Sequence, residues 1–303
     1  MEQNFFRGLL TSNINDAKVI LSSISFDMGC SCGTGAKDAP NTLRMLSSYL
    51  PPFSMTGYDL RKAKIYDYGE LTTNITLEKT KEFHDHIAKK AHELYEMNKV
   101  NIFFGGDHSI SIGTQKAFIK YATENNKIPV IIHLDAHPDI CNEYDGSIYS
   151  HACTNMRALE NGLNAKNLAL IGIRGYEECE VELLNNNKEI KVYTAKFLND
   201  QNIRYAVEEI IRLYDNPKYL VYISYDIDCN DPAFAPGTGT PEAFGLDSNS
   251  VLFIIRSLVK HLNVKAMDFV EISPKLDTNN ITSWLALKTL YEVLETYIKK
   301  GEF

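Results

Sequence analysis

The sequence predicts an α/β fold in which helices cover both faces of a mostly parallel sheet. Two observations support this prediction. Short apolar runs rich in Val, Ile and Phe are typical of strands buried on both faces, and they alternate with longer segments of helical period. The 303 residues contain no internal repeat, low-complexity tract or Pro- or Gly-rich linker that would divide the chain. We therefore expect a single domain over residues 1–303.

Six segments of the chain are expected to form strands. All are short and apolar, as strands covered on both faces tend to be. They are residues 19–24, 100–104, 130–134, 168–173, 220–224 and 264–270. Four longer segments carry apolar residues at helical spacing and are expected to form amphipathic helices between the strands. They are residues 77–98, 203–214, 248–261 and 281–299.

Composition and charge exclude several classes of protein. The chain is 44% hydrophobic and 23% charged, as ordinary globular proteins are, and its formal net charge is −8. Nucleic acid is not expected as a partner, because phosphate binding needs clustered Lys and Arg. No segment approaches the roughly 20 apolar residues that span a bilayer, and the first residues lack the features of a signal peptide. We therefore expect a cytoplasmic protein with neither a nucleic-acid nor a membrane partner.

The unusual residues of the sequence follow four of the expected strands. Residues 105–109 read Gly-Gly-Asp-His-Ser, residues 135–139 read Asp-Ala-His-Pro-Asp, residues 226–228 read Asp-Ile-Asp, and residues 271–274 read Glu-Ile-Ser-Pro. Ligands of parallel α/β sheets bind beyond the carboxyl ends of the strands. Segments far apart in the sequence are therefore expected to converge on one site.

Acidic and histidine side chains alternate in two of these segments. In an extended chain Asp135, His137 and Asp139 point the same way, and the proline after His137 favours that extended conformation. Asp226 and Asp228 have the same i, i+2 spacing. A single Asp-x-Asp is more often a solvated loop. Several such groups at the ends of apolar strands instead favour a metal site.

The number of candidate ligands favours two metal ions. A tetrahedral zinc site uses four ligands, whereas two ions about 3.5–4 Å apart share carboxylates and use more. Oxygen-rich ligation with some imidazole suits Mn²⁺ or Mg²⁺. Four carboxylates would balance two divalent ions, and Glu271 with Glu242 would add negative charge, so the pocket should favour a cationic substrate. The candidate ligands are His108, Asp135, His137, Asp139, Asp226 and Asp228.

These segments closely resemble motifs of the ureohydrolases, the arginase and agmatinase family. The resemblance covers nearly the whole chain, and the motifs occur in order. They are residues 33–40 in looser form, 105–109, 135–139, 224–232, 235–242 and 270–274. The resemblance implies a three-layer α/β/α fold, two Mn²⁺ ions per subunit and a homo-oligomer, either a trimer or a hexamer.

The resemblance also implies how the ligands divide between the two ions. Asp135 and Asp226 would bridge them. One ion would be bound by His108, Asp135, Asp139 and Asp226, and the other by Asp135, His137, Asp226 and Asp228.

The family's catalytic roles transfer to four residues. Asp139 would orient the activated water that attacks a guanidinium carbon, and His151 would transfer a proton to the leaving amine. Glu271 would hold the guanidinium through charge-assisted hydrogen bonds. His151 and Glu242 would also contribute to substrate binding. We therefore expect a small cationic guanidino compound as substrate.

Agmatine, cleaved to putrescine and urea, is the preferred substrate. The Gly-Thr-Gly-Thr-Pro-Glu run that ends at Glu242 resembles agmatinases, and the stretch between Asp139 and His151 lacks the loop with which arginases recognise an amino-acid end. Phe244 stands where relatives usually have Gly, either at the pocket rim or packed outward. Ala152 also replaces a frequent Gly. Alternative substrates are arginine, 4-guanidinobutyrate and formiminoglutamate.

Three other functions are weighed against this one. A two-metal phosphoesterase would need Lys or Arg at the site, and Arg174 is the nearest candidate. A catalytically inactive relative would be expected to have lost ligands, and all are present. A bare metal-binding protein would need neither Glu271 nor His151.

We assign no role to several other histidines or to the cysteines. His84 and His86 diverge on a helix and are expected on its solvated face. His133 shares the direction of Asp135, so it is expected either next to the metal ligands or as a buried core histidine. The six cysteines match no disulfide framework or zinc spacing and are expected to be free thiols.

Overall fold

Eight parallel strands form the centre of the molecule. The computed structural model describes residues 5–301, and its sheet has the strand order β2-β1-β3-β8-β7-β4-β5-β6, with each neighbouring pair parallel. The strands are β1 (Val19–Ser23), β2 (Ile65–Glu70), β3 (Val100–Phe104), β4 (Ile128–Leu134), β5 (Leu168–Ile173), β6 (Lys191–Thr194), β7 (Tyr219–Asp226) and β8 (Val264–Val270).

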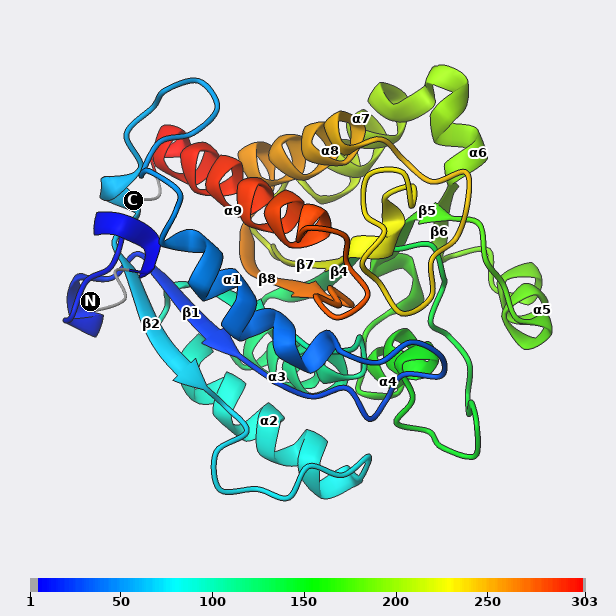
Figure 1. Cartoon of the computed structure of the whole chain (residues 1–303). Coiled ribbons are helices and arrows are strands. Elements are labelled where there is room, and N and C mark those ends of the chain that lie inside the picture. Colours follow the sequence, from blue (N-terminus) through cyan, green and yellow to red (C-terminus); the bar gives the residue numbers. More distant parts are fainter. Residues whose placement is uncertain (1–4, 302–303) are drawn as a thin grey trace.

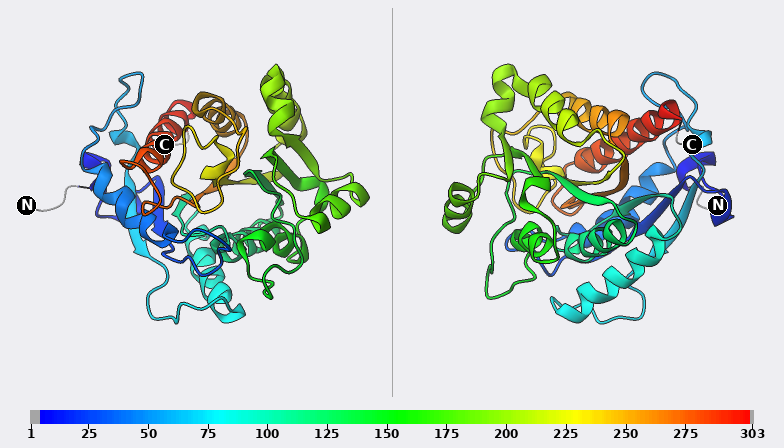
Figure 2. Two further views of the ribbon diagram at one scale, coloured as in Figure 1. Left: turned by 45° about the vertical axis from the view of Figure 1, so that its right-hand side comes forward. Right: turned by 180° about the vertical axis from the view of Figure 1, so that it is seen from behind.

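Helices cover both faces of the sheet, which confirms the predicted three-layer α/β/α fold (Figures 1 and 2). One layer holds α2 (Lys81–Tyr95), α3 (Ile110–Glu124) and α4 (Thr154–Glu160). The other holds α1 (Ala39–Ser47), α7 (Ile203–Tyr214), α8 (Ser248–His261) and α9 (Ile281–Lys300). Two further helices, α5 (Glu178–Asn186) and the single turn α6 (Ala195–Phe197), lie on the β5–β6 side. Within residues 5–301, no helix is long and apolar enough to cross a membrane.

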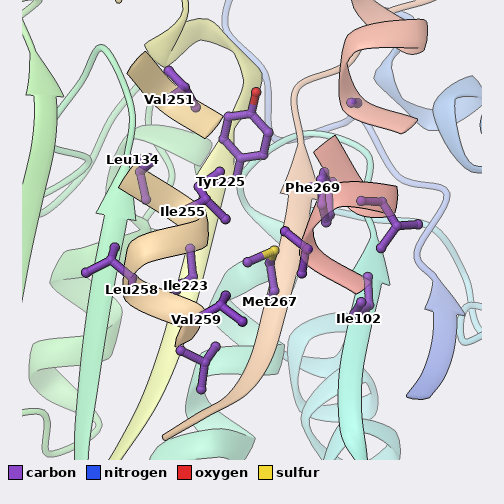
Figure 3. Packing of buried hydrophobic residues seen from close by; sticks show 14 of the residues in the cluster. Ile102, Leu134, Ile223, Tyr225, Val251, Ile255, Leu258, Val259, Met267 and Phe269 are labelled. Carbon is purple, nitrogen blue, oxygen red and sulfur yellow. The ribbon is translucent and has the colours of Figure 1, made fainter. Parts of the chain in front are cut away.

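One apolar face of α8 packs against the middle of the sheet (Figure 3). The residues at i, i+4, i+7 and i+8 form this face, and all are buried: Val251, Ile255, Leu258 and Val259. They belong to the same hydrophobic cluster as Ile223 of β7 and Met267 of β8. Burying one such side chain stabilises a fold by about 1.5–3 kcal/mol. The contact therefore fixes this layer over the central strands.

All six predicted strands and all four predicted helices are present, with ends shifted by a few residues. The helix expected over residues 77–98 spans Lys81–Tyr95 and begins after Thr80, whose side chain accepts a hydrogen bond from the Phe83 amide. Two strands and several helices were not predicted. The edge strands β2 and β6 are only partly buried and lack a continuous apolar run. Helix α3 is buried around most of its circumference, so its sequence lacks an amphipathic pattern.

The four central strands end next to one another at one edge of the sheet. β3, β8, β7 and β4 are consecutive in the strand order and run parallel. Near that edge Val270 of β8 pairs with Asp226 of β7, and Tyr225 pairs with Leu134 of β4. The segments that follow these strands are therefore adjacent in space, as the sequence predicted.

Candidate active site

Every predicted site residue lies at this edge of the sheet or in a loop beside it. The candidate ligands come from the ends of β3, β7 and β4, with β8 between β3 and β7 in the sheet. His108 lies in the turn between β3 and α3, and three ligands follow β4: Asp135, His137 and Asp139. Asp226 is the last residue of β7, and Asp228 lies in the helical turn after it. Glu271 follows β8, and His151 opens the short helical turn before α4.

His108 faces three carboxylates. Its Nδ1 atom lies 2.9 Å from Asp135 Oδ2, 3.0 Å from Asp226 Oδ2 and 3.2 Å from Asp139 Oδ2. All four side chains are buried, and neither His108 Nδ1 nor Asp135 Oδ2 has a hydrogen-bond partner of good geometry. Burying polar atoms without partners is costly. This donor set therefore fits a cation held between the imidazole and the carboxylates.

A second group of donors lies beside the first. His137 Nδ1 is 3.2 Å from Asp228 Oδ2 and 3.5 Å from Asp135 Oδ1. Asp135 thus turns one oxygen to each group. Donor atoms of His108, Asp135 and Asp139 lie within 4.8 Å of one another, and so do those of Asp135, His137 and Asp228. Asp226 Oδ2 faces His108 of the first group, while its Oδ1 accepts a hydrogen bond at 2.8 Å from the backbone amide of Asp228, a residue of the second group. Two donor groups that share a carboxylate fit a pair of ions.

His133 lies beside the donor cluster. Its Nε2 atom is 2.9 Å from Asp135 Oδ2, and its ring stacks on that of His108 with the centroids 4.7 Å apart. It belongs to the donor group that contains His108, Asp135 and Asp139. Of the two alternatives left open for His133, the structure supports a position next to the candidate ligands.

The charges of the cluster favour a cation among the carboxylates. Burial raises the pKa of Asp226 well above its usual range, and the neighbouring Asp228 and Asp135 charges add to the shift. Burial and the Asp135 charge raise the pKa of Asp139 in the same way. Burial alone would lower the pKa of His108, yet contact with Asp135 and Asp139 raises it to about 10. The carboxylates therefore stabilise positive charge at Nδ1, which a metal ion would supply.

The backbone of the ligand segments differs from the predicted extended chain. Asp139 has a φ of 54°, in the left-handed region, and Ile227–Cys229 forms a helical turn directly after Asp226. The prediction of strictly alternating side chains is therefore wrong for both segments. The donors still converge, because the chain turns at the strand ends and short hydrogen bonds hold the turns. The amides of His137 and Asp228 donate to Asp135 Oδ1 and Asp226 Oδ1, at 2.6 and 2.8 Å.

A buried hydroxyl and carboxylate hold the His108 ring from behind. Ser224 Oγ lies 2.8 Å from His108 Nε2 and donates to Asp268 Oδ1 at 2.9 Å. Asp268 is fully buried and also accepts from Ser111 and Tyr222, each at 2.6 Å. Because Ser224 gives its only hydrogen to Asp268, it accepts one from His108 Nε2–H. This arrangement turns Nδ1 toward the carboxylates, as partners of metal-binding histidines commonly do.

His151 and Glu271 face each other next to the cluster. His151 Nδ1 lies 3.1 Å from Glu271 Oε1, and its Nε2 lies 3.0 Å from Ser31 Oγ. Glu271 Oε1 also accepts the His108 amide at 2.8 Å. Burial would lower the pKa of His151, but the Glu271 carboxylate raises it above its usual value. The Glu271 carboxylate therefore favours the protonated form of His151.

A pocket of about 150 Å³ borders the cluster. The predicted residues that line it are His137, Asp139, His151 and Glu242. Sequence reasoning missed Tyr144, Tyr176, Glu177 and Glu180, which lie in segments without a recognisable motif. Among the described residues that line the pocket, none is Lys or Arg, while three are Glu. The pocket is therefore suited to a cation.

Two substitutions noted in the sequence have different positions. Ala152 lines the pocket, whereas Phe244 does not. The Phe244 side chain is 85% exposed, so of its two expected positions the outward one is found. Its φ of 64° lies in the region that favours glycine, which gives a physical reason for the Gly usual in relatives.

The expectation of a solvated His84 is wrong. His84 is 2% exposed and stacks on Tyr149, with the ring centroids 5.0 Å apart. Phe26 and Phe83 contact the ring edge-on, and burial lowers the pKa of His84 to about 3. The spacing of His84 and His86 on a helix could not reveal that aromatic residues cover α2 at this point.

The Arg174 guanidinium donates hydrogen bonds to backbone carbonyl groups. Its Nη2 atom donates to the carbonyls of Asp228 and Glu242, each at 2.7 Å, and its other nitrogens donate to Gly172 and Ala243. The guanidinium therefore fastens the loop around Glu242. Arg174 does not line the pocket. The basic residue that a phosphoesterase would need is therefore not supplied by Arg174.

Sequence comparison places these features in a known family. Residues 17–295 match the family model described as the arginase family. The agmatinase of Proteus mirabilis is 30% identical over 289 residues, which is 91% of this chain and 88% of that protein. The agmatinase of Escherichia coli strain SE11 is 31% identical over 300 residues, which is 95% of this chain and 90% of that protein.

Solved structures agree with this placement. The agmatine ureohydrolase of Thermoplasma volcanium has a TM-score of 0.85 and 30% identity, and the match covers 99% of this chain and 97% of that one. The proclavaminate amidino hydrolase of Streptomyces clavuligerus has a TM-score of 0.84, 28% identity and coverage of 98% and 97%. The chain belongs to the arginase family. Within that family it is an agmatinase-like ureohydrolase, a hydrolase that acts on guanidino C–N bonds.

Proposed function

We propose that this chain hydrolyses agmatine to putrescine and urea with two Mn²⁺ ions. The observation that carries the proposal is the pair of donor groups that share Asp135, next to a pocket whose described lining residues include no Lys or Arg. The agmatinase names of its relatives agree with this choice of substrate.

Six residues would hold the ions. His108, Asp135, Asp139 and Asp226 would hold one, and Asp135, His137, Asp226 and Asp228 would hold the other. Divalent ions in such a pair lower the pKa of water and so supply a hydroxide nucleophile near neutral pH. Manganese suits a set of four carboxylates and two imidazoles without a thiolate.

The residues beside the cluster would position the substrate and move protons. Glu271 would accept hydrogen bonds from the guanidinium, as a buried carboxylate binds this group most strongly when both are charged. Asp139 would orient the nucleophile. His151, whose pKa is raised by Glu271 against the effect of burial, would give its proton to the leaving amine. Without that proton the amine would have to leave as an anion.

The pocket favours agmatine over the alternative substrates. Agmatine carries an ammonium at the end opposite its guanidinium, whereas arginine, 4-guanidinobutyrate and formiminoglutamate each carry a carboxylate. Glu177, Glu180 and Glu242 line the pocket, so a carboxylate there would be repelled while an ammonium would be attracted. The whole chain would form one ureohydrolase domain of a cytoplasmic protein that serves polyamine synthesis. The family resemblance implies that this protein is a trimer or a hexamer.

Product release from four compounds tests this proposal. The Mn²⁺-loaded protein is assayed with agmatine, arginine, 4-guanidinobutyrate and formiminoglutamate at equal concentrations. For formiminoglutamate, formamide replaces urea as the product measured. We expect turnover mainly of agmatine and its loss in the His151→Asn variant with the bound metal unchanged. Turnover mainly of a carboxylate-bearing compound would contradict the substrate, and no turnover of any of them would contradict the reaction.

A further inference from the structure

Two thiols outside the donor cluster are in contact. Cys141 Sγ and Cys179 Sγ lie 3.4 Å apart although 38 positions separate them in the sequence. Cys141 lies in the loop after β4, and Cys179 is the second residue of α5. Both are free thiols, as the sequence predicted. Their spacing in the sequence gave no sign that they would meet, because loop and helix are brought together only by the fold.

We propose that Cys141 and Cys179 are an oxidation site that forms an intramolecular disulfide when a small neutral peroxide reaches Cys179. The two thiols differ in access. Cys179 is exposed, whereas Cys141 is 1% exposed. A diffusing oxidant therefore meets Cys179 first, and Cys141 is the partner already in place behind it. Such sites usually combine a low-pKa, accessible thiol with a resolving thiol beside it. Here Cys179 is accessible, and Cys141 is the resolving thiol in contact with it.

The surroundings of the pair select the class of oxidant. The surface hollow that contains both cysteines is lined by acidic residues and one tyrosine: Glu143, Tyr144, Glu177, Glu178 and Glu182. Negative charge at this density repels anions such as the carboxylate-bearing disulfides of peptides. Hydrogen peroxide is uncharged and small, so it is not repelled. The charge therefore favours a peroxide over thiol–disulfide exchange.

The chemistry balances with one peroxide per disulfide. The Cys179 sulfur attacks one peroxide oxygen, the O–O bond breaks, and a sulfenic acid forms while one water leaves. The Cys141 sulfur then attacks the Cys179 sulfur, the S–S bond forms, and the sulfenic oxygen leaves as a second water. Two thiols together lose two electrons and two protons. The peroxide gains both and ends as two molecules of water.

The new bond would tie the mouth of the pocket to a ligand segment. Cys141 follows Asp139 by two residues, and Cys179 directly precedes Glu180. The buried Glu180 carboxylate already joins the two segments, because Oε1 accepts the Ile140 amide at 3.0 Å and Oε2 accepts the Glu177 amide at 2.9 Å. Sulfurs in a disulfide are about 2.05 Å apart, so the two side chains must move closer, and any part of that movement that their rotation does not supply falls on the two segments. Displacement of a positioned group by about 1 Å can lower a rate by about 100-fold.

Peptide mapping of the full-length, Mn²⁺-loaded protein tests the oxidation site directly. The protein is treated with one to five equivalents of hydrogen peroxide, alkylated and digested without reductant. We expect one cross-linked species that joins the Cys141 and Cys179 peptides and is lighter by two hydrogen atoms than their sum. It should be absent in Cys179→Ser and present in Cys32→Ser, a matched variant at another exposed thiol. Sulfinic acid at Cys179 without the cross-link, or equal cross-linking to other cysteines, would overturn the proposal.

Activity measurements test the consequence separately. After treatment we expect agmatine turnover to fall by about 10- to 100-fold and to recover with dithiothreitol, while Cys179→Ser keeps its activity throughout. A complete cross-link without loss of turnover would contradict the predicted effect of the disulfide on the Asp139 segment. The mapping experiment does not depend on turnover, so an untreated protein that releases no urea counts against the proposed function and not against the oxidation site.

Discussion

At the scale of single residues, the hydrogen bond behind His108 offers a sharp test of the metal site. Ser224→Ala removes the group that accepts His108 Nε2–H and leaves the ring free to turn. Loss of such a supporting partner typically lowers metal affinity by 10- to 100-fold. We expect a loss of that size in Mn²⁺ titrations followed by calorimetry, and only a smaller change in unfolding free energy.

The matched control is Ser111→Ala. Ser111 is equally buried and donates to the same carboxylate, at Asp268 Oδ2. Within residues 5–301 its hydroxyl makes no hydrogen bond to the His108 ring. Its removal should lower stability to a similar degree and leave Mn²⁺ affinity nearly unchanged. Equal losses of affinity in both variants would mean that Asp268 acts through general packing and not through Ser224.

The acidic pocket predicts that Glu177 contributes to substrate binding. Glu177→Gln removes one charge from the pocket while keeping the shape of the side chain. Because Glu177 is exposed, the ion pair with the substrate ammonium should contribute only about 0.2–1 kcal/mol. We therefore expect KM for agmatine to rise about 1.5- to 5-fold with kcat unchanged. The neighbouring Glu178→Gln, which does not line the pocket, should behave as the wild type, and an equal effect there would rule out a specific contact.

The buried His84 and the contact between Cys141 and Cys179 could not be predicted at this scale. Both depend on what a loop places against a helix, and loop conformation has no periodic pattern to read. The donors could be predicted, because Asp and His at the ends of apolar strands are unusual enough to be noticed one by one.

At the scale of elements, the turn between β3 and α3 depends on close backbone contact. A Cβ atom on Gly106 would lie 1.6 Å from the carbonyl oxygen of Phe26, so Gly106→Ala must push the two segments apart. Forced overpacking of this kind typically costs about 1–3 kcal/mol. We expect at least that loss of unfolding free energy in denaturant titrations, with weaker Mn²⁺ binding because His108 is two residues away.

Gly146→Ala provides the comparison. No atom lies within 4 Å of a Cβ at Gly146, whose φ is 72°, so only the strain of a left-handed alanine, about 1–2 kcal/mol, should appear. Metal affinity should not change. If Gly106→Ala bound Mn²⁺ as tightly as Gly146→Ala does, the close approach to Phe26 would not be needed for the site.

The elements differed in how well the sequence predicted them. The six inner strands were recognisable, because burial on both faces demands continuous apolar runs. The edge strand β2 has one buried residue at its start and partly exposed residues after it, so its pattern resembles a loop. The predicted extended geometry at Asp139 failed because a single positive φ turns the chain, and an Asp in that conformation cannot be told from an extended one by sequence.

At the scale of the whole molecule, the topology of the sheet brings the site together. The strand order places the ends of β3, β8, β7 and β4 side by side, so ligands more than a hundred positions apart in the chain become neighbours. This convergence follows from the rule that parallel strands present their carboxyl ends at one edge. The pocket walls contributed by α5 and its preceding loop do not follow from that rule, because they depend on how the outer segments close over the edge.

Urea release from agmatine during a Mn²⁺ titration of metal-free protein tests the central claim most directly. Two donor groups that share Asp135 predict no urea without metal and a rate that saturates at two equivalents of Mn²⁺ per chain. Asp226→Asn alters a carboxylate that contacts His108 of one group and Asp228 of the other. This variant should release almost no urea at any concentration of Mn²⁺. Saturation at one equivalent, or urea release in the rigorously metal-free protein, would contradict a two-ion site.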